Sequence, residues 1–177
     1  LGRQLKKIIS YAATRVDAAV NHYSGGLIKT DFGIKANSIG MGSEDNPMSN
    51  SWWNRQMIKE NCDLEFEDDV RGDYELTIEE TSVLERFSDS FSKIVAMVVL
   101  QFNDFSKTEN DLSTKINLAN AILERIAIVK AYYKENELQL LSFQAVQSRD
   151  LIIDYFFAPH ICAIKDFVSL NSDLNLS

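Results

Sequence analysis

Cysteine, histidine, proline and glycine are all scarce in this chain of 177 residues, which has two Cys, two His, two Pro and seven Gly. So few cysteines exclude a disulfide-rich scaffold, and so few prolines and glycines exclude a collagen-like chain. Hydrophobic residues make up 45% and charged residues 25% of the sequence, which is close to the average of globular proteins. Because a chain of this length can bury roughly 70% of its unfolded surface, we expect one globular domain over residues 1–177.

Long apolar runs are also missing. The longest, Ile94 to Leu100, has seven residues, whereas a membrane-spanning helix needs about 20. No amino-terminal basic and apolar signal is present, so we expect a cytoplasmic protein without a membrane anchor. Two cysteines in 177 residues are typical of a reducing compartment, which favours free thiols at Cys62 and Cys162, although the sequence alone does not decide whether they pair.

Negative charge is abundant and unevenly distributed. The whole chain has 26 acidic and 18 basic residues, a net charge of −8. Residues 60–90 hold twelve acids against two bases, a balance of −10, whereas residues 1–35 hold six bases against two acids, a balance of +4. An acidic surface repels phosphate backbones, so nucleic acid is an unfavourable partner and a protein with a basic surface is a favourable one.

Apolar residues recur at helical spacing over most of the chain. The pattern predicts amphipathic helices over residues 3–23, 81–105, 111–134 and 136–157. Pro159 is expected to end the last of these, and a short helix over residues 161–168 to follow. The fold class expected from this pattern is all-α, a bundle of roughly five helices.

Two segments interrupt the helical pattern. Residues 27–50 are rich in Ser, Asn, Asp and Gly and predict a long irregular loop, which a short helix through residues 52–58 follows. Over residues 62–79, Leu64, Phe66, Tyr74, Leu76 and Ile78 alternate with acids at period two. This alternation predicts a small acidic β-hairpin inserted into the bundle.

One candidate catalytic pair lies in the first predicted helix. Arg15 and His22 are seven positions apart, which is two helical turns, so both side chains fall on one face. A histidine can move a proton and an arginine can hold a phosphate. The spacing resembles the Arg-x4–6-His element of HEPN-type ribonucleases, and this resemblance implies RNA cleavage without a metal. The alternative is an exposed helix charge and a histidine that favours the helix end.

The acidic stretch from Asp63 to Asp73 and the tryptophan pair Trp52 and Trp53 are the candidate partner-binding residues. The stretch does not follow the order of acids in an EF-hand loop, so we expect no metal site there. Exposed carboxylates can instead dock a basic partner, and exposed tryptophans are enriched at binding hot spots. The candidate site therefore comprises Trp52, Trp53, Glu65, Glu67, Asp68 and Asp69. The alternatives are a solvated surface and tryptophans that cover the core.

Two short matches carry less information. Asp31-Phe32-Gly33 matches the metal-binding triplet of protein kinases, but the other kinase motifs do not accompany it. Residues 90–96, Ser-Phe-Ser-Lys-Ile-Val-Ala, resemble the segment that opens the central helix of Bcl-2-like proteins, with Ser92 in place of glycine. The resemblance implies a groove that binds an amphipathic helix, whereas a buried central helix would explain the same residues.

No assembled catalytic motif and no cofactor-binding motif is recognisable in the sequence. The favoured hypothesis is therefore a non-enzymatic interaction protein: a regulator, an inhibitor or immunity-type protein, or an assembly subunit. It would dock a basic protein partner through the acidic hairpin and exposed aromatics, without a cofactor or a metal. The sequence is also compatible with a homo-oligomer. The HEPN-like ribonuclease is the second hypothesis, and the Bcl-2-like groove is the third.

Overall fold

The computed structural model describes residues 3–37, 76–107, 109–136 and 142–171. Within these ranges the chain forms helices and no strand, which confirms the all-α prediction for this part of the protein. The helices are α1 (Arg3–Tyr23), α2 (Phe32–Asn37), α4 (Ile78–Phe105), α5 (Leu112–Glu135) and α6 (Phe143–Leu170).

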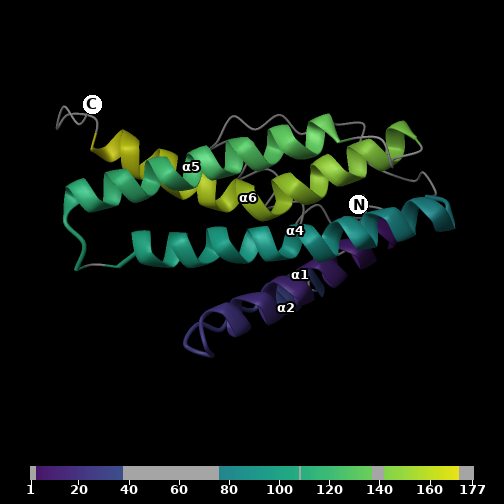
Figure 1. The fold of residues 1–177 in the computed structure, drawn as a ribbon, viewed down its shortest axis with the longest axis horizontal. Helices are drawn as coiled ribbons and strands as arrows, with labels where there is room; N and C mark the ends of the chain where they lie inside the picture. The colour runs from purple at the N-terminus through teal and green to yellow at the C-terminus, as the bar shows by residue number, and fades with distance from the viewer. Residues whose placement is uncertain (1–2, 38–75, 108, 137–141, 172–177) are drawn as a thin grey trace, which may run out of the picture.

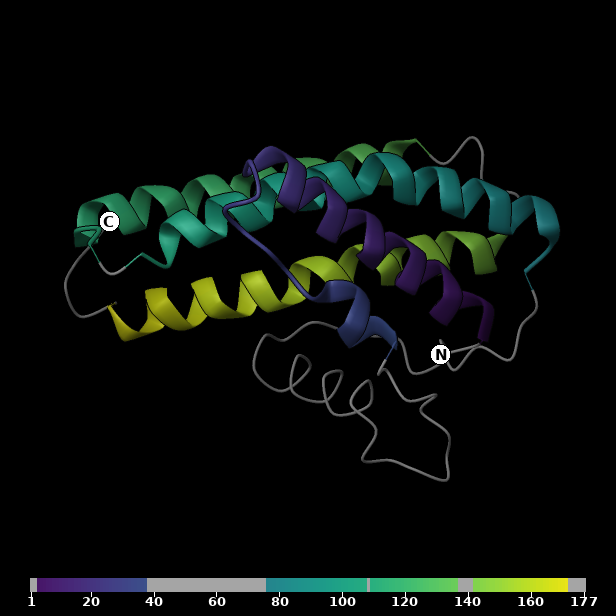
Figure 2. The ribbon, with the colours of Figure 1, turned by 90° about the horizontal axis from the view of Figure 1, so that it is seen from below.

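The long helices pack side by side (Figure 1). Ring contacts fix their directions: Phe91 of α4 contacts Phe157 of α6, and Phe105 contacts Phe167 further along both helices, so α4 and α6 run parallel. Phe87, near the start of α4, contacts Tyr133, near the end of α5, so α5 runs antiparallel to both. Figure 2 shows α1 crossing α4 and α6 obliquely, on the side away from α5.

The core lies where these four helices meet. Its largest fully buried side chains are contributed by every long helix: Ile8, Ile9, Val16 and Val20 of α1, Leu84 and Phe91 of α4, Ile122 of α5, and Ile152, Phe156, Phe157 and Ile164 of α6. Fully burying a side chain of this size stabilises the fold by roughly 1.5–3 kcal/mol. The apolar stripes of the sequence are therefore the inner faces of the helices.

Helix α1 follows its predicted bounds. Leu5, Ile9, Val16 and Val20 are buried along one face, as the apolar stripe predicts. The helix stops at the Ser24-Gly25-Gly26 turn, where both glycines have positive φ (63° and 82°). Glycine adopts this left-handed conformation without a Cβ penalty, which is why a glycine pair suits a helix end.

The predicted loop over residues 27–50 is wrong at residues 32–37, which form α2, whereas residues 27–31 connect α1 to α2 without helix or strand. Asp17 of α1 starts this short helix: its carboxylate accepts hydrogen bonds from the backbone N–H groups of Phe32 (3.0 Å) and Gly33 (2.8 Å) and from the Thr30 hydroxyl. A Cβ on Gly33 would lie 3.2 Å from both Asp17 Oδ2 and Thr14 Oγ1. The Asp31-Phe32-Gly33 triplet thus includes a glycine that allows α2 to approach α1 closely.

The predicted hairpin over residues 62–79 is wrong at its carboxyl end. Ile78 and Glu79 are the first residues of α4, which begins three residues before the predicted start. The Leu76 backbone pairs with the Gln4 side chain of α1, through Leu76 N–H to Gln4 Oε1 (2.7 Å) and Gln4 Nε2 to the Leu76 carbonyl (3.1 Å). Residues 62–75 of the predicted hairpin lie outside the described residues, as do residues 38–50 of the loop and the predicted helix over 52–58.

Helix α6 does not end at Pro159, so the predicted break and separate final helix are wrong. Proline removes the hydrogen bond that its N–H would donate to the Tyr155 carbonyl, at a cost of about 3 kcal/mol in a helix interior. Buried side chains on both sides of it, among them Phe156, Phe157, Ile161 and Ile164, hold the helix against its neighbours. Their combined burial outweighs the cost of the proline.

The expectation of free thiols is also wrong. Cys162 of α6 is disulfide-bonded. The other cysteine of the sequence, Cys62, lies outside the described residues. Disulfides are typical of an oxidising environment, so the low number of cysteines is no longer an argument for the expected cytoplasmic location.

Candidate functional site

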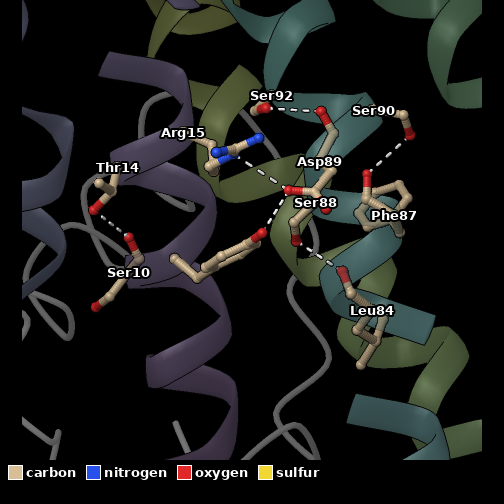
Figure 3. A network of polar contacts seen from close by, with 10 residues as sticks. Ser10, Thr14, Arg15, Leu84, Phe87, Ser88, Asp89, Ser90 and Ser92 are labelled. Atoms are coloured by element: carbon tan, nitrogen blue, oxygen red, sulfur yellow. Dashed lines mark hydrogen bonds and ion pairs between the residues drawn. The ribbon is translucent and has the colours of Figure 1, made fainter. Parts of the chain in front are cut away.

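A polar cluster joins α1 to α4 on the molecular surface (Figure 3). The Tyr11 hydroxyl donates a hydrogen bond of 2.6 Å to Asp89 Oδ1, and Arg15 Nε lies 3.3 Å from the same oxygen. The side chains of Arg15 and Asp89 are 51% and 42% exposed. Because Tyr11 donates to a carboxylate, the pKa of its hydroxyl is raised above 10. The cluster therefore keeps the Tyr11 proton in place.

This cluster acts as a contact between helices. A half-exposed ion pair contributes about 0–1 kcal/mol, and Tyr11 and Arg15 together orient α1 on α4. Sequence reasoning had singled out Arg15 and missed Tyr11 and Asp89. Tyr11 is one helical turn from Arg15, and this spacing indicates that the two side chains are neighbours. Only the fold brings Asp89 to the pair.

The two residues of the HEPN-like element have different surroundings. Arg15 contacts Asp89 of α4, whereas His22 is exposed in the last turn of α1, where its ring meets Tyr23 edge to face at 5.4 Å. The position of His22 agrees with the alternative of a histidine at a helix end, where its positive form interacts favourably with the carbonyl groups.

One buried carboxylate links the starts of α4 and α6. Glu80 is 5% exposed, and its Oε1 accepts from the Thr77 N–H (2.9 Å), while the Thr77 hydroxyl accepts from the Glu80 N–H (3.1 Å). Its Oε2 accepts from the Ser142 hydroxyl, and Ser142 itself caps α6 by accepting from the Ala145 N–H (3.1 Å). The hydrogen bond from Ser142, followed by those from Thr77, lowers the pKa of Glu80 below 4.5. We call Thr77, Glu80, Ser142 and Ala145 the capping link.

Arg149 is buried, at 2% exposure, near the start of α6. Its guanidinium donates to the Tyr133 carbonyl at 2.7 Å and to Asp150 Oδ1 at 2.9 and 3.1 Å. The first bond supplies a cation to the carboxyl end of α5, where backbone carbonyls lack helical partners. Arg149 thereby joins α5 to α6 at the same end of the bundle as the capping link.

His160 is the one buried histidine of the chain, since the other, His22, is exposed. Its ring lies 4.8 Å from that of Phe102, and its Nε2 has no hydrogen-bond partner among the residues that the structure describes. Burial lowers the pKa of His160 to about 4, because an imidazolium would lose its hydration there. The side chain is therefore neutral at pH 7.

Helix α5 exposes an apolar face to solvent. Ile128 is 61% and Tyr132 57% exposed, and Ala127 and Ala131 beside them are exposed as well. The opposite face holds the buried side chains Ala119, Ile122, Ile126 and Val129. Apolar residues on two faces make α5 unlike α1, whose second face is largely polar. The apolar spacing over residues 111–134 predicts an amphipathic helix but does not separate the exposed apolar face from the buried one.

The predicted partner-binding residues Trp52, Trp53, Glu65, Glu67, Asp68 and Asp69 all lie outside the described residues. Residues 90–96, which carry the resemblance to Bcl-2-like proteins, lie in the middle of α4, where Phe91, Ser92, Val95 and Ala96 are buried. Among the described residues, no three His, Cys, Asp or Glu side chains are close enough to hold a metal ion.

Comparison with known proteins finds no match: no family model fits the chain, and no curated protein and no solved structure is similar to it. None of the described helices is both long and apolar enough to cross a membrane.

Proposed function

We propose that this protein is an interaction module that binds a protein partner with a basic surface, as a regulator, an inhibitor or an assembly subunit. The observation that carries the proposal is the segregation of charge, with twelve acids against two bases over residues 60–90. Such a field steers an oppositely charged partner toward one region of the surface and accelerates encounter. Trp52 and Trp53, next to this region in sequence, supply large apolar contacts.

The exposed apolar face of α5 supports the same proposal. Single exposed apolar residues are ordinary on a protein surface, whereas neighbouring ones mark interaction sites. Ile128 and Tyr132 lie one turn apart on this face.

Charge reversal tests the proposal. In a variant with Glu65, Glu67, Asp68 and Asp69 all changed to Lys, we expect a basic partner captured by the wild-type protein from a lysate of its own cells to be lost. We expect the wild-type interaction to weaken between low and high salt, because the Debye length falls from about 30 Å at 0.01 M to about 3 Å at 1 M. Mass spectrometry of the retained proteins is the measurement.

The control carries the same change of net charge outside residues 60–90, with Asp31, Asp104, Glu109 and Asp166, all exposed, changed to Lys. It should retain the partner, and both variants should keep the thermal unfolding midpoint within a few degrees of the wild type. Capture of the same proteins by the wild type and by the first variant would contradict the proposed function.

A further inference from the structure

The exposed face of α5 has a defined pattern of charge. Glu124, Ile128, Ala131 and Glu135 follow one another at spacings of four, three and four residues, so they form one stripe along the helix, and all four are exposed. Ala127 and Tyr132 flank the middle of this stripe. We call these six residues the outer α5 stripe.

The stripe has an apolar centre and an acid at each end. The alanines leave the backbone of α5 accessible to close approach, while Ile128 and Tyr132 project beside them, so a second helix can lie along the centre. Glu124 and Glu135 then face whatever the second helix carries at its two ends. The neighbouring cations Arg125 and Lys134 lie off the line of the stripe.

We propose that the outer α5 stripe binds an amphipathic helix of the partner, one with an apolar centre and a Lys or Arg at each end, about eleven residues apart. Helix binding of this kind uses apolar anchors at i, i+3 or i+4, and i+7. The positive ends complement Glu124 and Glu135. The inference rests on the proposed function, because it names the element by which a basic partner is recognised.

Charge argues against a second copy of this chain as the occupant. An antiparallel copy of α5 centred on the stripe would place Glu124 of one chain opposite Glu135 of the other at both ends, and a parallel copy would place each acid opposite itself. Like charges in such positions destabilise a pair of helices. Two chains of net charge −8 also repel each other at long range.

A synthetic peptide provides the probe. It is cross-linked to hold a helix, with leucines along the central seam and a lysine at each end of that seam, and its binding to the whole protein is followed by fluorescence anisotropy. We expect Ile128→Ser to weaken binding at least about tenfold, because a central anchor dominates such contacts. Glu124→Gln combined with Glu135→Gln should weaken binding and remove most of its salt dependence.

Matched controls use the same residue types elsewhere. Ile34 of α2 is 73% exposed, so Ile34→Ser changes an exposed isoleucine outside the stripe, and Glu85→Gln combined with Glu109→Gln removes two exposed acids. Neither control should change the peptide affinity by more than about twofold. Because the altered side chains are exposed, every variant should keep the wild-type unfolding midpoint.

Three results would overturn the inference. The first is the absence of peptide binding, and the second is equal binding by the wild type and Ile128→Ser. The third is self-association in analytical ultracentrifugation that Ile128→Ser abolishes, because the stripe would then bind a second copy of this chain. The test is separate from that of the proposed function, because the charge-reversed residues 65–69 lie outside α5. Loss of the peptide contact with retained capture would reject the stripe alone.

Discussion

A single buried residue, His160, makes the stability of the fold depend on pH. Its pKa is about 4 in the folded protein and about 6.5 in the unfolded chain. Between these values the unfolded chain binds more protons, so the free energy of unfolding falls as the pH falls from about 6.5 to about 4. A shift of this size lowers the free energy of unfolding by ~3 kcal/mol near pH 4 and has no effect above pH 7.

Urea unfolding of the wild type and of His160→Gln across this range checks the effect. The wild type should lose stability steeply below pH 6.5, and the variant should lose much less. His22→Gln is the matched control, because the exposed His22 has no comparable burial, and this variant should follow the wild type. Parallel curves for the wild type and His160→Gln would show that His160 is not neutral and buried in solution.

At the scale of elements, the capping link couples two helices that are distant in sequence. Glu80 accepts a hydrogen bond from the Thr77 N–H at the start of α4. It accepts another from the hydroxyl of Ser142, which caps α6. Each helix start has backbone N–H groups without helical partners, and a cap contributes typically about 1 kcal/mol. Removing the Glu80 carboxylate also leaves the Thr77 N–H and the Ser142 hydroxyl without their acceptor, and a buried donor left unsatisfied costs about 1–3 kcal/mol.

We therefore expect Glu80→Ala to lower the free energy of unfolding by about 2–4 kcal/mol. The exposed neighbour Glu79 is the control. Glu79→Ala should cost less than about 1 kcal/mol, because it removes only the interaction of this carboxylate with the helix dipole. A double-mutant cycle with Ser142→Ala should give a coupling of at least about 1 kcal/mol, measured by chemical denaturation. Strict additivity of the two changes would mean that α4 and α6 are capped independently.

At the scale of the whole molecule, the disulfide at Cys162 links α6 covalently to another cysteine. The sequence has two cysteines. If both are consumed in the bond, the protein unfolded in denaturant without reductant should not react with a maleimide. After reduction it should take up two labels, which mass spectrometry counts directly. Labelling of the unreduced, unfolded chain would contradict a disulfide.

Several features of this protein could be predicted from the sequence alone. Local spacing is enough to identify α1, α4, α5 and the all-α class, because burial of one face of a helix requires apolar residues at every third or fourth position. The glycine pair after α1 likewise indicates its end, since positive φ is a local property. The overall acidity follows from composition and needs no structure.

The tertiary structure decided the features that depend on contacts between distant residues. Asp17 starts a helix at Phe32, and α6 continues through Pro159 because packing on both sides outweighs one lost hydrogen bond. Ile78 belongs to a helix, although its alternation with acids is that of a strand, because Thr77 and Glu80 cap α4 there. The position of Asp89 against Arg15 and the exposure of Ile128 are settled by which helix faces meet, and a periodic pattern on one helix does not specify its neighbours.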